Sequence, residues 1–173
     1  RQWLEFFGNN TVYLLYRTFQ PAVTQIQRSI DGGLTYGPAT TAGAIGQVGG
    51  TAIDQNDGTV YVSGSTGQVC VGIPPAAGLP PVTYTCHTAA SDPNGVAHLF
   101  FPVKVGADGT AYVAYSNDHA IYLVHSTDKG NTWSQPVRVS DGPDTLTSLL
   151  PALETGPAPG SVGIAWYGTH LAH

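Results

Sequence analysis

A short pattern of residues recurs four times along the chain. The stretches TVYLLY, TVYVSG, TAYVAY and SVGIAW begin at Thr11, Thr59, Thr110 and Ser161. They follow one another at intervals of about 50 residues, and a fixed spacing of this size indicates a repeat architecture. Their valine, isoleucine and tyrosine residues favour β-strands. The chain is therefore expected to place four related strands in equivalent positions of four repeats.

Each repeat opens with two strands joined by a tight turn. The four strands are preceded by Asn9-Asn10, Asp57-Gly58, Asp108-Gly109 and Pro159-Gly160, which suit hairpin turns. Apolar stretches stand before these turns, at Trp3–Phe7, Thr51–Ile53, Leu99–Val105 and Leu149–Leu153. Third strands are expected at Val23–Arg28, Gln68–Ile73 and Ala120–His125, and a fourth strand is expected at Ser134–Val139.

Repeats of four antiparallel strands predict an all-β fold, a β-propeller built from four-stranded blades. The whole chain, 1–173, then forms one partial propeller of about three and a half blades. The predicted boundaries place blade 1 at about 1–45, blade 2 at about 46–92, blade 3 at about 93–144 and the start of blade 4 at about 145–173. The 22 glycines and 13 prolines agree with short strands and many turns.

Charge and hydropathy exclude some classes of function. The formal charge is −5, and the six Lys and Arg residues are scattered, so a nucleic-acid surface is not expected. No apolar run reaches the roughly 20 residues of a membrane span. The histidines lack paired metal spacing, and the segment Asp54–Gly58 has the glycine one position too early for a calcium loop. We therefore predict neither a metal nor a cofactor.

Two cysteines, Cys70 and Cys86, stand in the predicted outer strands of blade 2. They are candidates for a structural disulfide, for two buried thiols or for a redox pair. Because the two strands are expected to be hairpin neighbours in a lysine-poor chain, we favour the disulfide. A disulfide favours a secreted or extracytoplasmic protein.

A polar turn with an aromatic end occurs twice, as SIDGGLTY from Ser29 and STDKGNTW from Ser126. An Asp carboxylate in such a turn accepts backbone N–H bonds, a glycine supplies positive φ, and the aromatic ring folds back onto the strands. The structural residues predicted in this way are Ser29, Asp31, Gly33, Tyr36, Ser126, Asp128, Gly130 and Trp133. Turn chemistry explains the spacing, so Asp31 and Asp128 are not taken as catalytic acids.

These two turns resemble the Asp-box, or BNR repeat, of sialidase-like β-propellers. The resemblance extends over the whole chain as blades, and it implies a propeller of six blades when complete. Remaining blades are then expected from the same polypeptide or from a second chain. Members of this class include sialidases, other glycoside hydrolases and non-catalytic propellers. The resemblance therefore implies a glycan as a ligand, but it does not fix whether the protein catalyses a reaction.

Strand direction predicts which loops line the axial pocket. The Asp turns and the opening hairpins share one face, so the pocket lies at the other face, among the loops between second and third strands and between blades. Candidate catalytic residues there are Asp118, His119 and Arg17, and candidate substrate-binding residues are Arg1, Asp92, His98, Asn117 and His170. Asp118 is suited to general acid catalysis and His119 to orienting a glycan hydroxyl, although a polar turn explains the same residues.

The chain departs from what a sialidase needs. A sialidase requires an arginine cluster, a tyrosine activated by a glutamate, and an aspartate that acts as the acid. For the arginine cluster, only Arg1 and Arg17 are suitably placed. Glu5 and Glu154 are the only glutamates, and a partner tyrosine such as Tyr16 or Tyr167 is expected near them. Two functions are therefore kept: an exo-acting glycoside hydrolase of the sialidase-like class, with part of its site outside this chain, and a non-catalytic propeller that binds a carbohydrate or a protein.

Overall fold

The computed structural model describes residues 2–76, 79–96, 100–142 and 145–171. Every regular element in these ranges is a β-strand. The described residues therefore contain no helix long and apolar enough to cross a membrane. The strands are β1 (Gln2–Phe7), β2 (Thr11–Arg17), β3 (Thr24–Ser29), β4 (Thr40–Thr41), β5 (Val48–Ile53), β6 (Val60–Gly64), β7 (Gln68–Gly72), β8 (Thr85–Thr88), β9 (Val103–Val105), β10 (Ala111–Ser116), β11 (Ile121–Ser126), β12 (Val137–Arg138), β13 (Thr147–Thr155) and β14 (Val162–Thr169).

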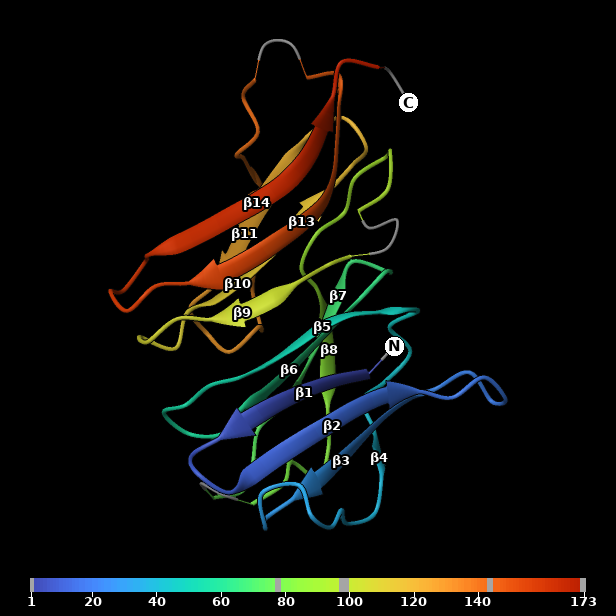
Figure 1. Ribbon diagram of the computed structural model, residues 1–173, viewed down its shortest axis with the longest axis vertical. Helices are drawn as coiled ribbons and strands as arrows, with labels where there is room; N and C mark the ends of the chain where they lie inside the picture. The colour runs from blue at the N-terminus through green and yellow to red at the C-terminus, as the bar shows by residue number, and fades with distance from the viewer. Residues whose placement is uncertain (1, 77–78, 97–99, 143–144, 172–173) are drawn as a thin grey trace.

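The strands form separate antiparallel sheets that follow the chain order. Strands β1–β4, β5–β8 and β9–β12 each make a four-stranded sheet, and β13 pairs with β14. We call these sheets blades 1 to 4. Figure 1 shows blade 1 at the lower end of the molecule and blade 4 at the upper end. The all-β fold and the four-stranded antiparallel sheets predicted from the repeats are confirmed.

The blades stack through apolar faces. The first strand of each blade is its innermost strand, and β1 contacts β5, β5 contacts β9, and β9 contacts β13. Tyrosines at the same place in the first three repeats take part in this packing. Tyr13 is buried in the core between blades 1 and 2, Tyr61 in the core between blades 2 and 3, and Tyr112 in the core between blades 3 and 4. Each tyrosine therefore fixes its blade to the next blade along the chain.

Two glycines permit close approach between elements. A Cβ at Gly49 of β5 would lie 2.7 Å from the backbone oxygen of Phe101, so only glycine lets these segments meet. Gly130, with φ +77°, lies in the turn after β11, and a Cβ there would lie 2.7 Å from Val71 in blade 2. The positive φ and the close contact both favour glycine at this position.

The two Ser-x-Asp turns have the same hydrogen bonds. In the second turn, the Ser126 hydroxyl donates to Asp128 Oδ1 (2.8 Å), and Thr132 donates its backbone N–H to Oδ1 (2.9 Å) and its hydroxyl to Oδ2 (2.6 Å). Asp31 accepts the corresponding bonds from Ser29 and Thr35 in the first turn.

The Ser-x-Asp turns lie beside the opening hairpins of the blades. Lys129, in the second turn, forms an ion pair with Asp57 of the β5–β6 hairpin. In the first turn, Gly32 N donates to the carbonyl oxygen of Asn10 in the β1–β2 hairpin (2.9 Å). These contacts place the turns and the hairpins at one end of the strands, so the β2–β3 loop and the loops between blades lie at the opposite end.

A disulfide joins Cys70 of β7 to Cys86 of β8, as expected from the sequence. The two residues are direct partners in the register of these strands. The loop between them takes the place of a Ser-x-Asp turn in blade 2, and its residues 77–78 lie outside the described ranges. The bond therefore crosslinks the outer hairpin of the blade that lacks such a turn.

Two predicted strands are shorter than expected. Of the predicted stretch 99–105, residue 99 lies outside the described ranges, and the described residues 100–105 contribute only Val103–Val105 as β9. The stretch 134–139 contributes only Val137–Arg138 as β12. Pro102 and Pro136 directly precede these strands. Because proline lacks the N–H that a ladder needs, the apolar stretches pair over only part of their length.

Candidate functional site

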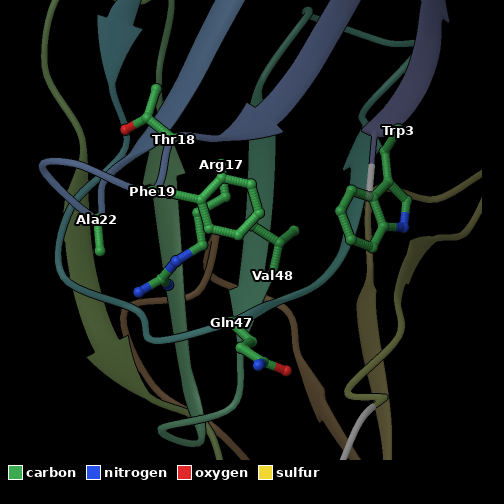
Figure 2. A pocket seen from close by; sticks show the side chains of 7 residues that line it. All are labelled: Trp3, Arg17, Thr18, Phe19, Ala22, Gln47 and Val48. Atoms are coloured by element: carbon green, nitrogen blue, oxygen red, sulfur yellow. The ribbon is translucent and has the colours of Figure 1, made fainter.

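A cavity of about 460 Å³ opens at the face opposite the Ser-x-Asp turns, between blades 1 and 2. Figure 2 shows Trp3 on one side of it and Arg17, Phe19 and Ala22 on the other. Its lining residues are Trp3, Arg17, Thr18, Phe19, Ala22, Gln47 and Val48. The lining comes from β1, the end of β2, the β2–β3 loop and the start of β5, so the cavity belongs to the face predicted for the pocket.

The β2–β3 loop holds one wall of the cavity. Thr18 N donates to the carbonyl oxygen of Val23 (3.0 Å), and the Thr18 hydroxyl donates to the carbonyl oxygen of Pro21. These bonds close the loop into a short turn and leave Phe19 at its tip with 92% of its surface exposed. An aromatic ring so open to solvent is available to a ligand.

The opposite wall is anchored to blade 2. Gln47 N donates to the Ser65 hydroxyl (2.9 Å), and Ser65 N donates back to the Gln47 carbonyl oxygen (2.8 Å). Val48 is buried, and Trp3 is half-buried against the core between blades 1 and 2. The hydrogen bonds to Ser65 therefore hold the Gln47 backbone, and the pairing of β1 with β2 holds the Trp3 backbone.

Chemically, the cavity combines a cation, an amide and two aromatic rings. The Arg17 guanidinium can bind a carboxylate with two parallel hydrogen bonds. The Gln47 side-chain amide supplies both a donor and an acceptor. The rings of Trp3 and Phe19 offer apolar surface for the C–H face of a ligand. This composition suits a small molecule with one negative group and an apolar side.

Of the residues that line this cavity, only Arg17 is among the site residues predicted from the sequence. The predicted site residues are Asp, His, Arg and Asn side chains, a set that does not include Trp3, Phe19 and Gln47. Phe19 carried a usable signal, because it is a large aromatic residue in the turn sequence TFQP, where a polar residue is expected.

The candidate residues Asn117, Asp118 and His119 lie in the β10–β11 turn. Asn117 is buried, and its side-chain oxygen accepts the backbone N–H bonds of His119 (3.2 Å) and Ala120 (2.9 Å). Its amide nitrogen donates to Asp92 Oδ2 (3.0 Å). Asp92 and Asn117 are thus brought together, and these bonds occupy the Asn117 side chain in closing the turn.

The remaining candidates lie in several places. Asp118 is half-buried in the left-handed region (φ 73°), while His119 and His170 are exposed. Arg1 and His98 lie outside the described residues. Within the described ranges, Arg17 is the only one of these candidates that lines the cavity. The structure therefore does not join Arg17, Asp118 and His119 in one cavity.

A second group of charged residues lies on the innermost strands. Lys104 of β9 forms an ion pair with Glu154 of β13 (3.0 Å). Burial raises the pKa of Glu5 on β1, with the Lys104 ammonium lowering it and the Glu154 carboxylate raising it by smaller amounts. The three side chains therefore influence one another across blades 1, 3 and 4.

The tyrosines beside these glutamates differ from those expected. In the β1–β2 register, Glu5 pairs with Tyr13, and the expected Tyr16 pairs with Gln2. Glu154 pairs with Gly163, while Tyr167 pairs with Leu149. Period-two alternation places Tyr16 on the other face of the sheet from Tyr13, which explains why Glu5 does not meet it.

Comparison with known proteins identifies the fold. Neither a protein-family model nor a curated protein matches the chain. Among solved structures, the β-propeller YCF48 bound to a D1 peptide is similar, with a TM-score of 0.56 and 16% sequence identity. The chain has a β-propeller fold. The alignment covers 94% of this propeller chain and 46% of the YCF48 chain, so the chain spans about half the length of this neighbour.

Proposed function

We propose that this chain is a propeller binding module whose cavity between blades 1 and 2 binds a carboxylate-bearing saccharide. The observation that carries this proposal is the grouping of Arg17 with Trp3, Phe19 and Gln47 around a cavity of about 460 Å³. A cavity of this size falls in the range of small-molecule sites. The carboxylate is assigned to Arg17, the ring hydroxyls to Gln47, and the C–H face of the sugar to the aromatic rings.

Two further proposals agree with this function. The resemblance of the Ser-x-Asp turns to the Asp-box supports a place among the sialidase-like propellers, in which glycans are common ligands. The Cys70–Cys86 disulfide supports a secreted or extracytoplasmic location. The peptide bound to YCF48 is evidence about that protein alone. A peptide with a carboxylate side chain is the competing ligand for this cavity, because Arg17 can bind its carboxylate in the same way.

Hydrolysis by Asp118 and His119 stays a prediction, as do substrate-binding roles for Arg1, Asp92, His98, Asn117 and His170. The described residues favour binding over hydrolysis, because Arg17 lines a cavity that Asp118 and His119 do not share and the Asn117 side chain closes its own turn. Incubation with fluorogenic glycosides, a sialoside included, tests hydrolysis directly. Turnover that is lost in Asp118→Asn would favour the hydrolase.

Calorimetric titration with matched sugars tests the binding proposal. Galacturonic acid and galactose differ only in having a carboxylate or a hydroxymethyl group at C6. We expect the acid to bind at least about tenfold more tightly, which corresponds to one charge-assisted hydrogen bond. Arg17→Gln is expected to abolish this preference, while Arg138→Gln, on the outer strand β12, preserves it.

Three outcomes would overturn the proposal. They are equal affinity for the two sugars, a preference that survives Arg17→Gln, and binding of an acidic peptide at the cavity without binding of either sugar. N-Acetylneuraminic acid is titrated in parallel because it also carries a carboxylate on a pyranose ring, with a glycerol side chain and an acetamido group in addition. Its affinity shows whether the cavity accepts the sialic acid that the family resemblance implies.

A further inference from the structure

A second cavity, of about 140 Å³, lies between the outer hairpin of blade 2 and the second Ser-x-Asp turn of blade 3. Val71 and Ile73 supply the apolar part of its lining. The polar side chains that line it are Thr83, Thr85, His87, Lys129 and Asn131. Each of these can donate a hydrogen bond, so the cavity offers an ammonium group and several neutral donors in a small space.

At both positions where the second Ser-x-Asp turn lines this cavity, it has a polar residue that the first turn lacks. Lys129 stands where the first turn has Gly32, and Asn131 stands where it has Leu34. The backbone is left-handed at Lys129 (φ 58°) and at Gly32 (φ 77°). Glycine adopts this conformation readily, whereas lysine does so at a cost in free energy. The shared turn structure therefore does not require a lysine or an asparagine at these positions.

Lys129 and Asn131 keep donors that their bonds within the described part of the chain do not use. The Lys129 ammonium has three N–H donors and forms an ion pair with Asp57. The Asn131 amide has two N–H donors and donates to the carbonyl oxygen of Asp128 (2.7 Å). Each group therefore retains at least one donor for a ligand.

His87 gives an observation that is independent of the turn. It lies on β8, opposite Val69 in the register, and it lines the cavity. Its Nε2 atom is buried and has no hydrogen-bond partner among the described residues. Buried polar atoms in folded proteins nearly always have a partner, and a bound ion is one explanation of an exception. An oxygen acceptor held in this cavity would supply the missing partner.

We propose that this cavity binds a tetrahedral oxyanion, which is a sulfate or phosphate group. Lys129 supplies the positive charge, as lysine does in many phosphate sites. The donor side chains are numerous enough for the four oxygens of such a group, whereas a carboxylate has only two oxygens. The cavity lies beside the second Ser-x-Asp turn, and the cavity that contains Arg17 opens at the opposite face. The oxyanion site therefore does not depend on the proposed carboxylate site.

Two-dimensional ¹H–¹⁵N NMR of the 18.0 kDa chain tests the proposal by titration with sodium sulfate and, separately, with sodium phosphate. Each titration is compared with sodium chloride at equal ionic strength. We expect saturable shifts in the amide signals of residues 83–87 and 129–131 and in the imidazole signals of His87. Chloride is expected to leave these signals nearly unchanged.

Three variants separate a ligand-binding role of Lys129 from a structural one. Lys129→Gly/Asn131→Leu introduces the residues of the first turn, so it is expected to fold and to weaken sulfate binding at least about tenfold. Asp57→Asn removes the ion-pair partner of Lys129 but keeps the oxygen that accepts the Thr59 N–H (2.9 Å). This variant is expected to strengthen sulfate binding, because all three ammonium donors can then serve the anion. Lys104→Gln changes the lysine of another ion pair and is expected to bind sulfate as the wild type does.

Galactose 6-sulfate distinguishes a sulfate ester from a free ion, and Arg17→Gln serves as the background so that the other cavity lacks its cation. Shifts in the same residues assign an ester to the site, and shifts with inorganic sulfate alone assign a free oxyanion; both results support the proposal. It is overturned if neither inorganic anion gives saturable shifts in these residues, if chloride reproduces the shifts, or if Lys129→Gly/Asn131→Leu binds sulfate as tightly as the wild type.

Discussion

The carboxylates of the two Ser-x-Asp turns are structural acceptors. Hydrogen bonds from the Thr132 hydroxyl, the Thr132 backbone N–H and the Ser126 hydroxyl lower the pKa of Asp128 to about 2. Bonds from Ser29 and Thr35 lower the pKa of Asp31 in the same way. A group held ionised by its own turn is poorly suited to act as a general acid near neutral pH, which agrees with the structural role predicted from the sequence.

Asp128→Asn is expected to lower Tm at neutral pH, because the amide replaces one acceptor oxygen with a donor. The folded-state pKa lies below the unfolded value of about 3.9, so the stabilisation by the carboxylate is present above about pH 4 and is lost as pH falls toward about 2. The Tm difference from the wild type should therefore shrink below pH 4. Thermal melts between pH 2 and pH 7 measure it, and the exposed Asp141→Asn serves as control. A difference that does not vary with pH would contradict this role.

The ionised form of Glu5 has the opposite effect on stability from that of Asp128. Burial raises its folded-state pKa, so ionisation of Glu5 costs stability as pH rises through the folded-state value, and this cost is absent at pH values below the unfolded pKa of about 4.3. Glu5→Gln is expected to raise Tm at pH 7 and to leave it unchanged near pH 3.5. A lower Tm at pH 7 would show instead that the attraction of Lys104 outweighs the effect of burial.

The turns could be predicted from the sequence, but the cavity could not. Asp31 and Asp128 were predictable because a turn is a local structure, and its residue types and spacing are visible in one stretch of sequence. The cavity joins Trp3, Arg17 and Gln47 from three separate segments. Their proximity follows from blade packing, which no local pattern encodes.

At the scale of elements, the repeats predict the start of a strand correctly where the strand pairs along its whole apolar stretch. The recurring second strands become β2, β6, β10 and β14 within one residue of the expected starts. The outer strands β4 and β12 have only two residues each. Their length depends on how far the edge of a blade can pair, and proline residues limit this in β12.

The disulfide makes a testable contribution to blade 2. Replacing both Cys70 and Cys86 with alanine is expected to lower the free energy of unfolding by about 3 kcal/mol, because the bond closes a loop of about 15 residues in the unfolded chain. Denaturant unfolding measures the change. Thiol labelling of the denatured, unreduced wild type should find no free cysteine, and two labelled thiols would contradict the assigned bond.

Trp133 fixes the second Ser-x-Asp turn to its blade. Its ring is half-buried against the core between blades 2 and 3, and its indole N–H donates to the Gly130 carbonyl oxygen (3.1 Å). Trp133→Ala is expected to cost about 2 kcal/mol of stability, less than for a fully buried ring. Trp133→Phe should recover most of the packing without the hydrogen bond. Denaturant unfolding of both variants tests this, and an unchanged stability in Trp133→Ala would contradict it.

At the scale of the whole molecule, the face with the Ser-x-Asp turns and the face with the cavity have different roles. The Ser-x-Asp turns and the opening hairpins interlock on one face through contacts such as Lys129 with Asp57. The opposite face carries the cavity of Arg17, Trp3 and Phe19. Because the strands separate these faces, ligand binding and turn stability are expected to respond to different substitutions.

Hydrogen exchange with and without galacturonic acid tests this division of faces most directly. The account predicts that saturating ligand slows exchange in residues 17–23 and 47–48 and leaves residues 29–36 and 126–133 unchanged. Galactose at the same concentration is the matched control and should have a much smaller effect. Protection confined to the two Ser-x-Asp turns, with none in the β2–β3 loop, would place the ligand on the opposite face and contradict the account.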